Sequence, residues 1–276
     1  MHLITHLFKL LTRSLVAKIL IAIYLLLVIF WIWIQYQGLT EGPINNLFGA
    51  LYPIISLTAG LYGLFIASKE WGGMSSLIGK GVIFLSLGLL AQVFGQLTWS
   101  YFTIIAGVEV PYPSIADIGY FLIIPFYAYA MYNFAKVAGV RVGLKTLSGQ
   151  LQAIVIPLLM IAVAFTLFLK DVDYDFLGDP IRTFLDFGYP GFEAIAISIG
   201  ILTYSLSRRV LGGIMRSRIL YFVFALVAAY ITDYMFLYQV GVDTYYNAGL
   251  VDFMYMTSFL IMSLGVISMR YPKDGK

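Results

Sequence analysis

The chain has 276 residues, of which 61% are hydrophobic and only 11% are charged. Soluble domains carry about 25% charged residues, so this composition excludes a soluble globular enzyme. The sequence contains no cysteine, which excludes disulfides, zinc-thiolate centres and cysteine nucleophiles. The formal net charge is only +3, and the distribution of the charges is more informative than their sum.

Long apolar segments follow one another along the chain. A bilayer core about 30 Å thick takes roughly 20 apolar helical residues to cross. The sequence therefore predicts an all-α polytopic membrane protein, with residues 1–276 as a single integral membrane domain. Residues 2–13 are expected to form an amphipathic lead-in before a first helix that is retained rather than cleaved. Eight transmembrane helices are predicted, at residues 16–36, 46–68, 77–105, 114–136, 150–169, 181–207, 218–239 and 248–269.

Basic residues indicate the orientation of these helices. Of the 17 lysines and arginines, 15 fall on one side of the predicted spans, and only Lys170 and Arg182 fall on the other. Because lysine and arginine are enriched in cytoplasmic loops, we expect a multi-pass protein of the cell membrane with both termini in the cytoplasm. The lipid bilayer is its expected partner.

A tyrosine recurs at a nearly constant interval. Tyr52, Tyr120, Tyr189 and Tyr255 are 68, 69 and 66 residues apart, and in the last three cases an aspartate stands three residues earlier. The dipeptide at 52–53 recurs at 189–190, and the turn at 69–73 resembles residues 209–213. We interpret this spacing as four parallel-repeat hairpins of about 68 residues, at about 1–70, 71–138, 139–209 and 210–276. Enrichment of aromatic residues at membrane interfaces is the alternative explanation.

Carboxylates inside the predicted spans are the strongest signal of a site, because a charge in the bilayer is costly and tends to face the bundle interior. With tyrosines and amides at the same level, they predict a polar chamber in the outer half of the bundle, with Gln92 and Glu193 as its floor. The expected ligand-binding residues are Glu193, Asp186, Tyr189, Asp233, Asp117, Tyr120, Asp252, Tyr255, Gln92, Gln96 and Trp99.

Two of these aspartates have a competing explanation. Asp117 follows a Pro-Ser pair, and Asp252 follows Asn247, so each could cap the start of its helix by accepting backbone N–H bonds. Glu193 lies about two turns beyond Asp186, too deep to act as a cap. We expect Glu193 to be either neutral or matched by Arg182.

The sequence lacks the residues that metal, cofactor and catalytic sites require. Histidine occurs only at positions 2 and 6, outside every span, so we predict no metal site, no cofactor and no catalytic residue. The basic residues line the predicted membrane surface and indicate lipid contact rather than nucleic-acid binding. The acidic segment 171–179 is expected to be a solvated loop, since it lacks the glycine and final glutamate of a calcium loop.

The segment from Val110 to Tyr120, with its Pro-Ser-x-Ala-Asp sequence, resembles a hairpin of the multi-span membrane sensor regions at the N-termini of bacterial diguanylate cyclases and histidine kinases. The resemblance implies a prokaryotic eight-helix sensor module. Because residues 271–276 leave no cyclase or kinase after the last predicted span, a separate signalling partner is expected to carry the output.

These observations favour a stand-alone, sensor-like or ligand-binding membrane protein that takes a small cationic or hydroxyl-bearing ligand from the outer side. A lipid or a quinone is an alternative ligand, because tyrosine and tryptophan line the same level. A small-solute or cation transporter is the first alternative, because repeats and midplane carboxylates are common in transporters. An intramembrane carboxylate enzyme is the second alternative. A path that is polar on both sides would favour transport, whereas the sequence places polar residues in the outer half.

Overall fold

A computed structural model describes residues 14–169, 178–207 and 213–270 of the protein. These residues form helices and no strand, and eight of the helical segments are long and apolar enough to cross a membrane. The predicted all-α membrane fold is therefore confirmed. The lead-in 2–13, most of the acidic loop 171–179 and most of the turn 209–213 lie outside the described residues.

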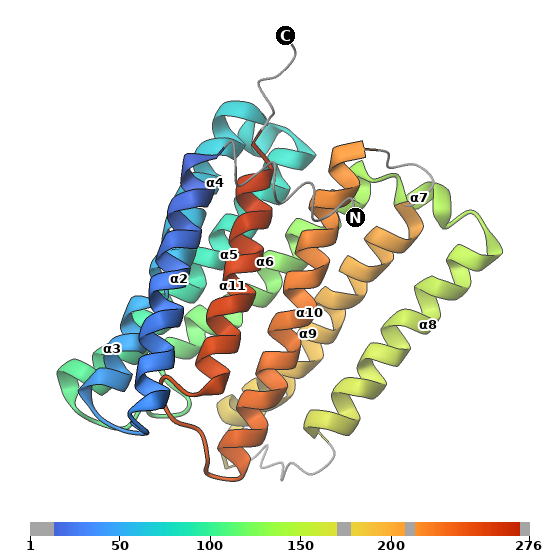
Figure 1. Cartoon of the computed structure of the whole chain (residues 1–276). Helices are drawn as coiled ribbons and strands as arrows, with labels where there is room; N and C mark the ends of the chain where they lie inside the picture. The colour runs from blue at the N-terminus through green and yellow to red at the C-terminus, as the bar shows by residue number, and fades with distance from the viewer. Residues whose placement is uncertain (1–13, 170–177, 208–212, 271–276) are drawn as a thin grey trace.

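The helices follow the predicted spans closely (Figure 1). They are α2 (Leu15–Tyr36), α3 (Pro43–Leu51), α4 (Ile54–Glu70), α5 (Leu77–Ser100), α6 (Ile115–Val137), the short α7 (Val140–Gly143), α8 (Leu147–Ala164), α9 (Pro180–Ser207), α10 (Gly213–Gly241) and α11 (Leu250–Ser268). The 3₁₀ turn Gly73–Ser75 precedes α5, and the π-helical turns Tyr101–Ala106 and Phe165–Leu169 extend α5 and α8.

The second predicted span differs from the expected single helix. It is divided into α3 and α4 at the Tyr52-Pro53 dipeptide. Proline has no backbone N–H and cannot donate to the preceding turn of a helix, which favours a break here, although Pro190 in the same dipeptide lies within the continuous helix α9. Tyr52 lies at this break and is buried.

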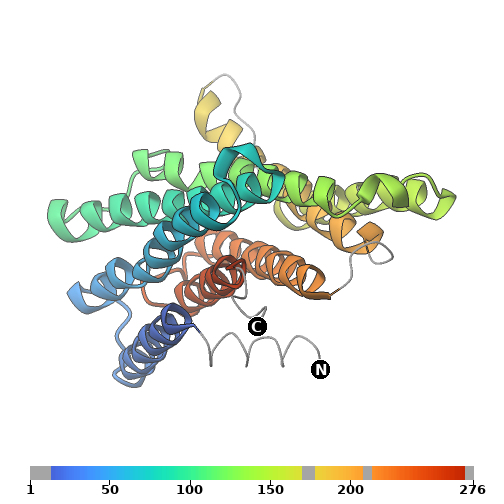
Figure 2. The same cartoon turned by 90° about the horizontal axis from the view of Figure 1, so that it is seen from above.

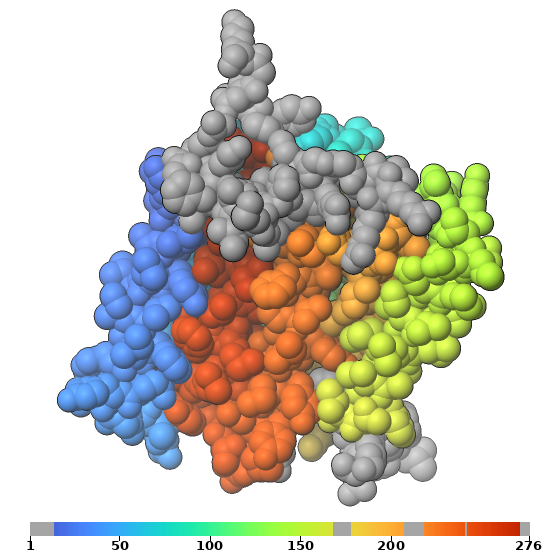
Figure 3. Space-filling model, turned by 45° about the vertical axis from the view of Figure 1, so that its right-hand side comes forward, coloured from blue at the N-terminus to red at the C-terminus, as the bar shows by residue number. Residues whose placement is uncertain are grey.

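Six helices form a closed cycle of contacts. Along the order α4, α5, α6, α9, α10 and α11, each helix packs against the next, and α11 returns to pack against α4. The other two spans lie outside this ring: α2 packs against α11, α3 and α4, and α8 packs against α9. Seen from above, α2 and α8 lie at opposite edges of the molecule (Figure 2), and α8 forms its right-hand edge in the space-filling view (Figure 3).

Hydrogen bonds join the early helices to α11 at both of its ends. The Trp31 indole donates to the Gly249 carbonyl at 3.2 Å, and the Gln35 amide donates to the Ala248 carbonyl at 2.8 Å. At the opposite end, the Trp71 indole donates to the Met269 carbonyl at 2.7 Å. Side chains from helices far apart in the sequence therefore bond the backbone at both ends of α11, and Trp71 satisfies a carbonyl that has no partner within the helix at its C-terminal end.

The two ends of the bundle have different charge. Lys69, Lys80, Lys136, Arg141 and Lys145 lie at one end, in or beside the ends of α4, α5, α6, α7 and α8. We call this end the basic side. Asp117, Asp179, Asp186 and Asp252 lie toward the opposite end, which we call the acidic side.

Candidate functional site

Two acidic side chains meet where α9, α10 and α11 come together. The carboxyl groups of Glu193 on α9 and Asp233 on α10 lie within hydrogen-bonding reach of each other. The Tyr255 hydroxyl of α11 donates to Asp233 Oδ1 at 2.5 Å. An ionised carboxylate has no donor, so a bond between Glu193 and Asp233 requires a proton on one of them. We call Glu193, Asp233 and Tyr255 the acidic group.

The acidic group lies well inside the bundle. Glu193 is thirteen residues from the start of α9, a distance of about 20 Å along the helix axis. Asp233 is eight residues before the end of α10, and Tyr255 is five residues into α11. All three side chains are half-buried, and among the described residues neither carboxylate forms an ion pair with a basic side chain.

The predicted match between Glu193 and Arg182 is wrong. Arg182 instead approaches Asp186, with 3.8 Å between Nε and Oδ2, and its side chain is 59% exposed. Eleven residues separate Arg182 from Glu193 on the same helix, about 16 Å along its axis. The arginine therefore stays at the acidic side of the bundle, while Glu193 takes a partner from the neighbouring helix.

A second polar group surrounds the amide of Gln96 on α5. Tyr52 donates its hydroxyl to Gln96 Oε1 at 2.6 Å, and Tyr120 donates to the same oxygen at 2.8 Å. An amide oxygen has two lone pairs, so it can accept both bonds. This arrangement joins the α3–α4 break to α6 through α5.

Asp117 and Asp252 both accept a backbone N–H near the start of their helices, but only Asp117 belongs to a capping box. Asp117 Oδ2 accepts the Ser114 backbone N–H at 2.7 Å and closes a capping box at the start of α6. Asp252 Oδ2 accepts the Ala248 backbone N–H at 2.7 Å.

The second oxygen of each aspartate accepts a tyrosine hydroxyl from elsewhere in the fold. Tyr189 donates to Asp117 Oδ1 at 2.9 Å, and Tyr245 donates to Asp252 Oδ1 at 3.0 Å. Asp117 therefore joins the start of α6 to α9, and Asp252 joins the start of α11 to the loop that precedes it.

The four recurring tyrosines share one role in the structure. Each donates its hydroxyl to a side-chain oxygen on another helix: Tyr52 and Tyr120 to Gln96, Tyr189 to Asp117, and Tyr255 to Asp233. The tyrosines thus connect ring helices through polar contacts in the acidic half of the bundle.

Asp186 and Trp99 lie apart from the acidic group. Asp186 accepts the Tyr112 hydroxyl at 2.7 Å, and the Trp99 indole donates to Asn247 Oδ1 at 3.2 Å. Burial, together with the hydrogen bond to Asp186, raises the pKa of Tyr112 above its ordinary value. The Tyr112 hydroxyl therefore stays protonated and holds the loop before α6 against α9.

Gln92, the other predicted floor residue, is fully buried on α5. Its amide lies beside the Tyr52 hydroxyl, but neither its nitrogen nor its oxygen has a hydrogen bond of normal geometry. Burying an amide without such bonds is costly. Gln92 is thus the least satisfied of the predicted site residues.

Several residues of the polar contacts were missed by sequence reasoning. Tyr52 belongs to the recurring series, but Gly49 stands where the other three repeats have the aspartate. Tyr112, Tyr245 and Asn247 lie in loops, where polar residues are ordinary. No periodic signal distinguishes these three from solvated residues.

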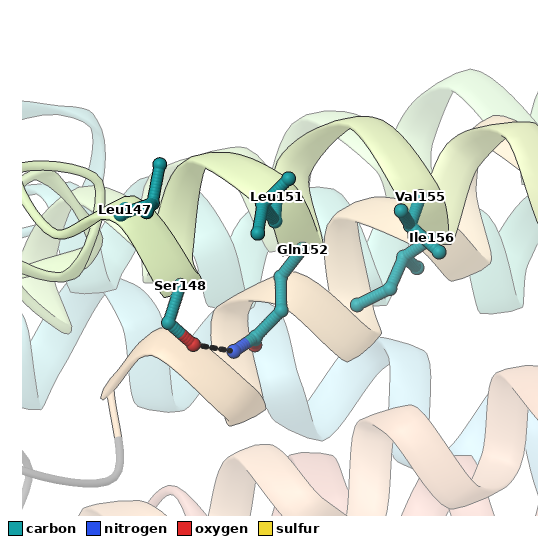
Figure 4. A pocket seen from close by; sticks show the side chains of 6 residues that line it. All are labelled: Leu147, Ser148, Leu151, Gln152, Val155 and Ile156. Atoms are coloured by element: carbon teal, nitrogen blue, oxygen red, sulfur yellow. Dashed lines mark hydrogen bonds between the residues drawn. The ribbon is translucent and has the colours of Figure 1, made fainter.

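Two surface pockets lie away from the acidic group. One is on α8 and includes Leu151, Gln152 and Ile156; a hydrogen bond joins Gln152 to Ser148 there (Figure 4). The other lies between α6 and α9. In the described part of the chain, no group of three or more acidic or histidine residues could hold a metal ion.

Comparison of the chain with protein-family models, with curated proteins and with solved structures finds no match.

Proposed function

We propose that the protein is a membrane-embedded, sensor-like ligand-binding protein whose ligand carries a positive charge and binds at the acidic group. The observation that carries this proposal is the contact between Glu193 and Asp233, two carboxyl side chains inside the bundle without a basic partner. The ligand class is a small organic amine or a monovalent cation. In its absence, the pair is expected to hold a proton.

Electrostatics supports a cationic ligand. Two ionised carboxylates at hydrogen-bonding distance repel each other, and both lose hydration inside the bundle. A bound cation would remove the repulsion and allow both groups to ionise. The Tyr255 ring, 6.3 Å from the Phe236 ring and 6.2 Å from the Phe259 ring, offers aromatic faces that also favour an organic cation.

The distribution of polar side chains favours binding over transport. The contacts of Gln96, Asp117, Asp233 and Asp252 lie in the acidic half of the bundle. We propose that the ligand enters from this side and that this side is the outside of the cell. Both chain termini would then be cytoplasmic, where a separate signalling partner would receive the output.

A cation transporter is the second candidate. The Tyr127 hydroxyl of α6 and the Ser263 hydroxyl of α11 are buried without a hydrogen-bond partner, and both lie farther toward the basic side than the acidic group. Polar atoms at that depth are what a path across the bundle would need. Uptake of a labelled ligand into sealed proteoliposomes distinguishes transport from binding alone.

Binding measurements with matched variants test the proposed function. Purified protein is screened with small amines and monovalent cations for a rise in thermal unfolding temperature. A ligand at a hundred times its Kd stabilises the folded state by about 2.7 kcal/mol. We expect this stabilisation to be lost in Glu193→Gln and Asp233→Asn.

Asp186→Asn is the control, because it removes a carboxylate from the same helix outside the acidic group. It should keep the ligand-induced stabilisation. A structural hydrogen bond alone would tolerate Glu193→Gln with a loss of about 1 kcal/mol or less in stability. An unchanged ligand response in Glu193→Gln, or no response of the wild type to any cation of the screen, would overturn the proposal.

A further inference from the structure

An apolar groove runs along the outer surface of the bundle between α6 and α9. Its walls include Pro125, Ala128 and Tyr132 of α6, and Phe192 and Ile195 of α9, and its volume is about 440 Å³. The small side chains of Ala128 and Pro125 leave space between the two helices. Because the groove opens on the side of the bundle that the bilayer surrounds, its natural occupant is a hydrocarbon chain.

The groove lies along the middle of the membrane-spanning helix α6. It extends from Phe121 to Tyr132 on α6, about 17 Å along the helix axis. The hydrocarbon core of a bilayer is about 30 Å thick, so one leaflet contributes about 15 Å. Phe121 lies six residues after the start of α6 and Tyr132 five residues before its end, so the groove crosses the centre of the bilayer. An acyl chain anchored on the basic side would enter it at Tyr132 and end beyond the midplane.

Positive charge gathers where the groove reaches the basic side. Lys136 lies one turn beyond Tyr132, with its Nζ 4.2 Å from the centre of the Tyr132 ring. The short helix α7 packs against both α6 and α9 at this end. Arg141 on α7 and Lys145 just after it are exposed.

Negative charge is absent from the same part of the sequence. No aspartate or glutamate occurs in residues 118–169 or in 194–207. The cations at this end of the groove therefore face no carboxylate from α6, α7, α8 or the second half of α9. An anionic group is the complement that this charge distribution lacks.

We propose that this groove is a binding site for an anionic phospholipid of the leaflet on the basic side. One acyl chain lies between α6 and α9, and the phosphate contacts Lys136, with Arg141 and Lys145 adding to the attraction. The site lies outside the acidic group, so it stands independently of the proposed ligand function.

The test compares lipids and variants in the purified full-length protein. Thermal unfolding and native mass spectrometry are measured with phosphatidylglycerol and, as the uncharged reference, phosphatidylcholine. A cation near a membrane surface contributes about 1 kcal/mol to the attraction of anionic lipid, which corresponds to a roughly fivefold change in affinity. We expect Lys136→Gln to weaken phosphatidylglycerol binding by about this factor.

Lys69→Gln is the matched control. Lys69 also lies over an aromatic ring on the basic side, 5.0 Å from the centre of the Phe65 ring on α4, but Phe65 does not line the groove. Its replacement should leave phosphatidylglycerol binding unchanged. Equal losses in Lys69→Gln and Lys136→Gln would indicate nonspecific surface attraction and would overturn the site.

Ala128→Phe tests the groove itself by filling it. We expect this variant to lose phosphatidylglycerol binding while its unfolding temperature in phosphatidylcholine stays near that of the wild type. If it does not fold, Ile195→Phe fills the same groove from α9. Retained lipid binding in a folded, filled variant would overturn the acyl-chain part of the site, and equal stabilisation by inorganic phosphate would show that a free anion is the ligand instead.

Discussion

The interface of α5 with α6 and the interface of α8 with α9 show two ways of placing an apolar helix in a bundle. In the span that contains α5, 50% of the residues in an apolar stretch of 18 residues are buried. In the span that contains α8, only 6% of the corresponding residues are buried. Three glycines of α5 each face an aromatic ring of α6: Gly81 faces Phe134, Gly88 faces Tyr127, and Gly95 faces Tyr120.

This glycine-aromatic interface depends on a matched spacing. The glycines are seven residues apart on α5, and so are the aromatic residues on α6, which keeps each series near one face of its helix. A Cβ atom added at Gly81 would lie 2.6 Å from the Phe134 ring, and one at Gly95 would lie 2.7 Å from the Tyr120 ring. The two helices approach closely because these positions have no side chain.

The contact of α8 has a different origin. Most of its leucines and isoleucines are exposed, with Leu158 61% accessible. Its described polar link to α9 is the hydrogen bond from the Ser205 hydroxyl to Gln152 Oε1 at 2.5 Å. Lipid is as apolar as leucine, so hydrophobicity does not drive helices together in a bilayer. The comparison teaches that small residues at a regular spacing, rather than hydropathy, determine which helices pack tightly.

The largest expected effect is that of Gly88→Leu on α5. The new side chain would overlap the Tyr127 ring, which touches the Gly88 position, and overpacking of this kind costs about 1–3 kcal/mol. We expect a clear fall in unfolding temperature in detergent. Tyr127→Ala, added to Gly88→Leu, makes room and should restore part of the loss; no loss in Gly88→Leu would refute the close packing of α5 and α6.

A smaller effect is expected for Gln152→Leu on α8. This change removes the hydrogen bonds of Gln152 with Ser205 and Ser148, and a polar contact between membrane helices contributes about 0.6 kcal/mol on average. Hydrogen exchange of α8 should increase, while exchange of α5 stays the same. Leu159→Ala, on the exposed side of the same helix, serves as the control. Equal exchange in wild type and Gln152→Leu would show that this link does not hold α8.

The smallest effect is expected for Leu158→Ala. Because Leu158 faces outward, its truncation should change the free energy of unfolding by less than about 0.5 kcal/mol. Leu89→Ala on α5 removes a fully buried side chain and should cost considerably more. A large loss of unfolding free energy in Leu158→Ala would mean that another molecule covers α8. It would contradict the description of α8 as the exposed helix.

Much of the fold could be predicted from the sequence. The eight spans follow from apolar length alone, since a bilayer sets the number of residues needed to cross it. The break at Tyr52-Pro53 was missed, although the missing N–H of Pro53 favours it locally. The regular spacing of the glycines on α5 is visible in the sequence. Its role in packing depends on the aromatic residues of α6, and the sequence does not show that α5 and α6 pack against each other at these positions.

The candidate site was predictable only in part. The capping box of Asp117 follows from Ser114, three residues earlier in the chain. Asp252 bonds the backbone just before its helix rather than the helix itself, which the neighbouring sequence does not predict. The partner of Glu193 was not predicted, because Asp233 is forty residues away and its approach depends on the rotation of α10 about its axis. Periodicity shows which residues share a helix face, but it does not show which neighbouring helix that face meets.

The four-hairpin repeat stays a prediction, and the helix packing adds a simpler regularity. In each half of the chain, the first span lies outside the ring and the next three spans belong to it. The best sequence matches also join the halves: Tyr52-Pro53 corresponds to Tyr189-Pro190, and Asp117 with Tyr120 corresponds to Asp252 with Tyr255. Superposition of α4, α5 and α6 on α9, α10 and α11 would test a twofold relation.

The closure of the ring by α11 bears on how the protein is made. A chain is synthesised from its N-terminus, so α2, α4 and α5 enter the membrane long before the helix that completes their contacts. Until α11 arrives, Asp233 lacks the Tyr255 hydroxyl and the Trp71 indole lacks the Met269 carbonyl. The ring therefore stays open on the side of α4 and α10 until the last span has been synthesised. A ribosome that stops before α11 would release a bundle that lacks the helix joining its first and last ring members.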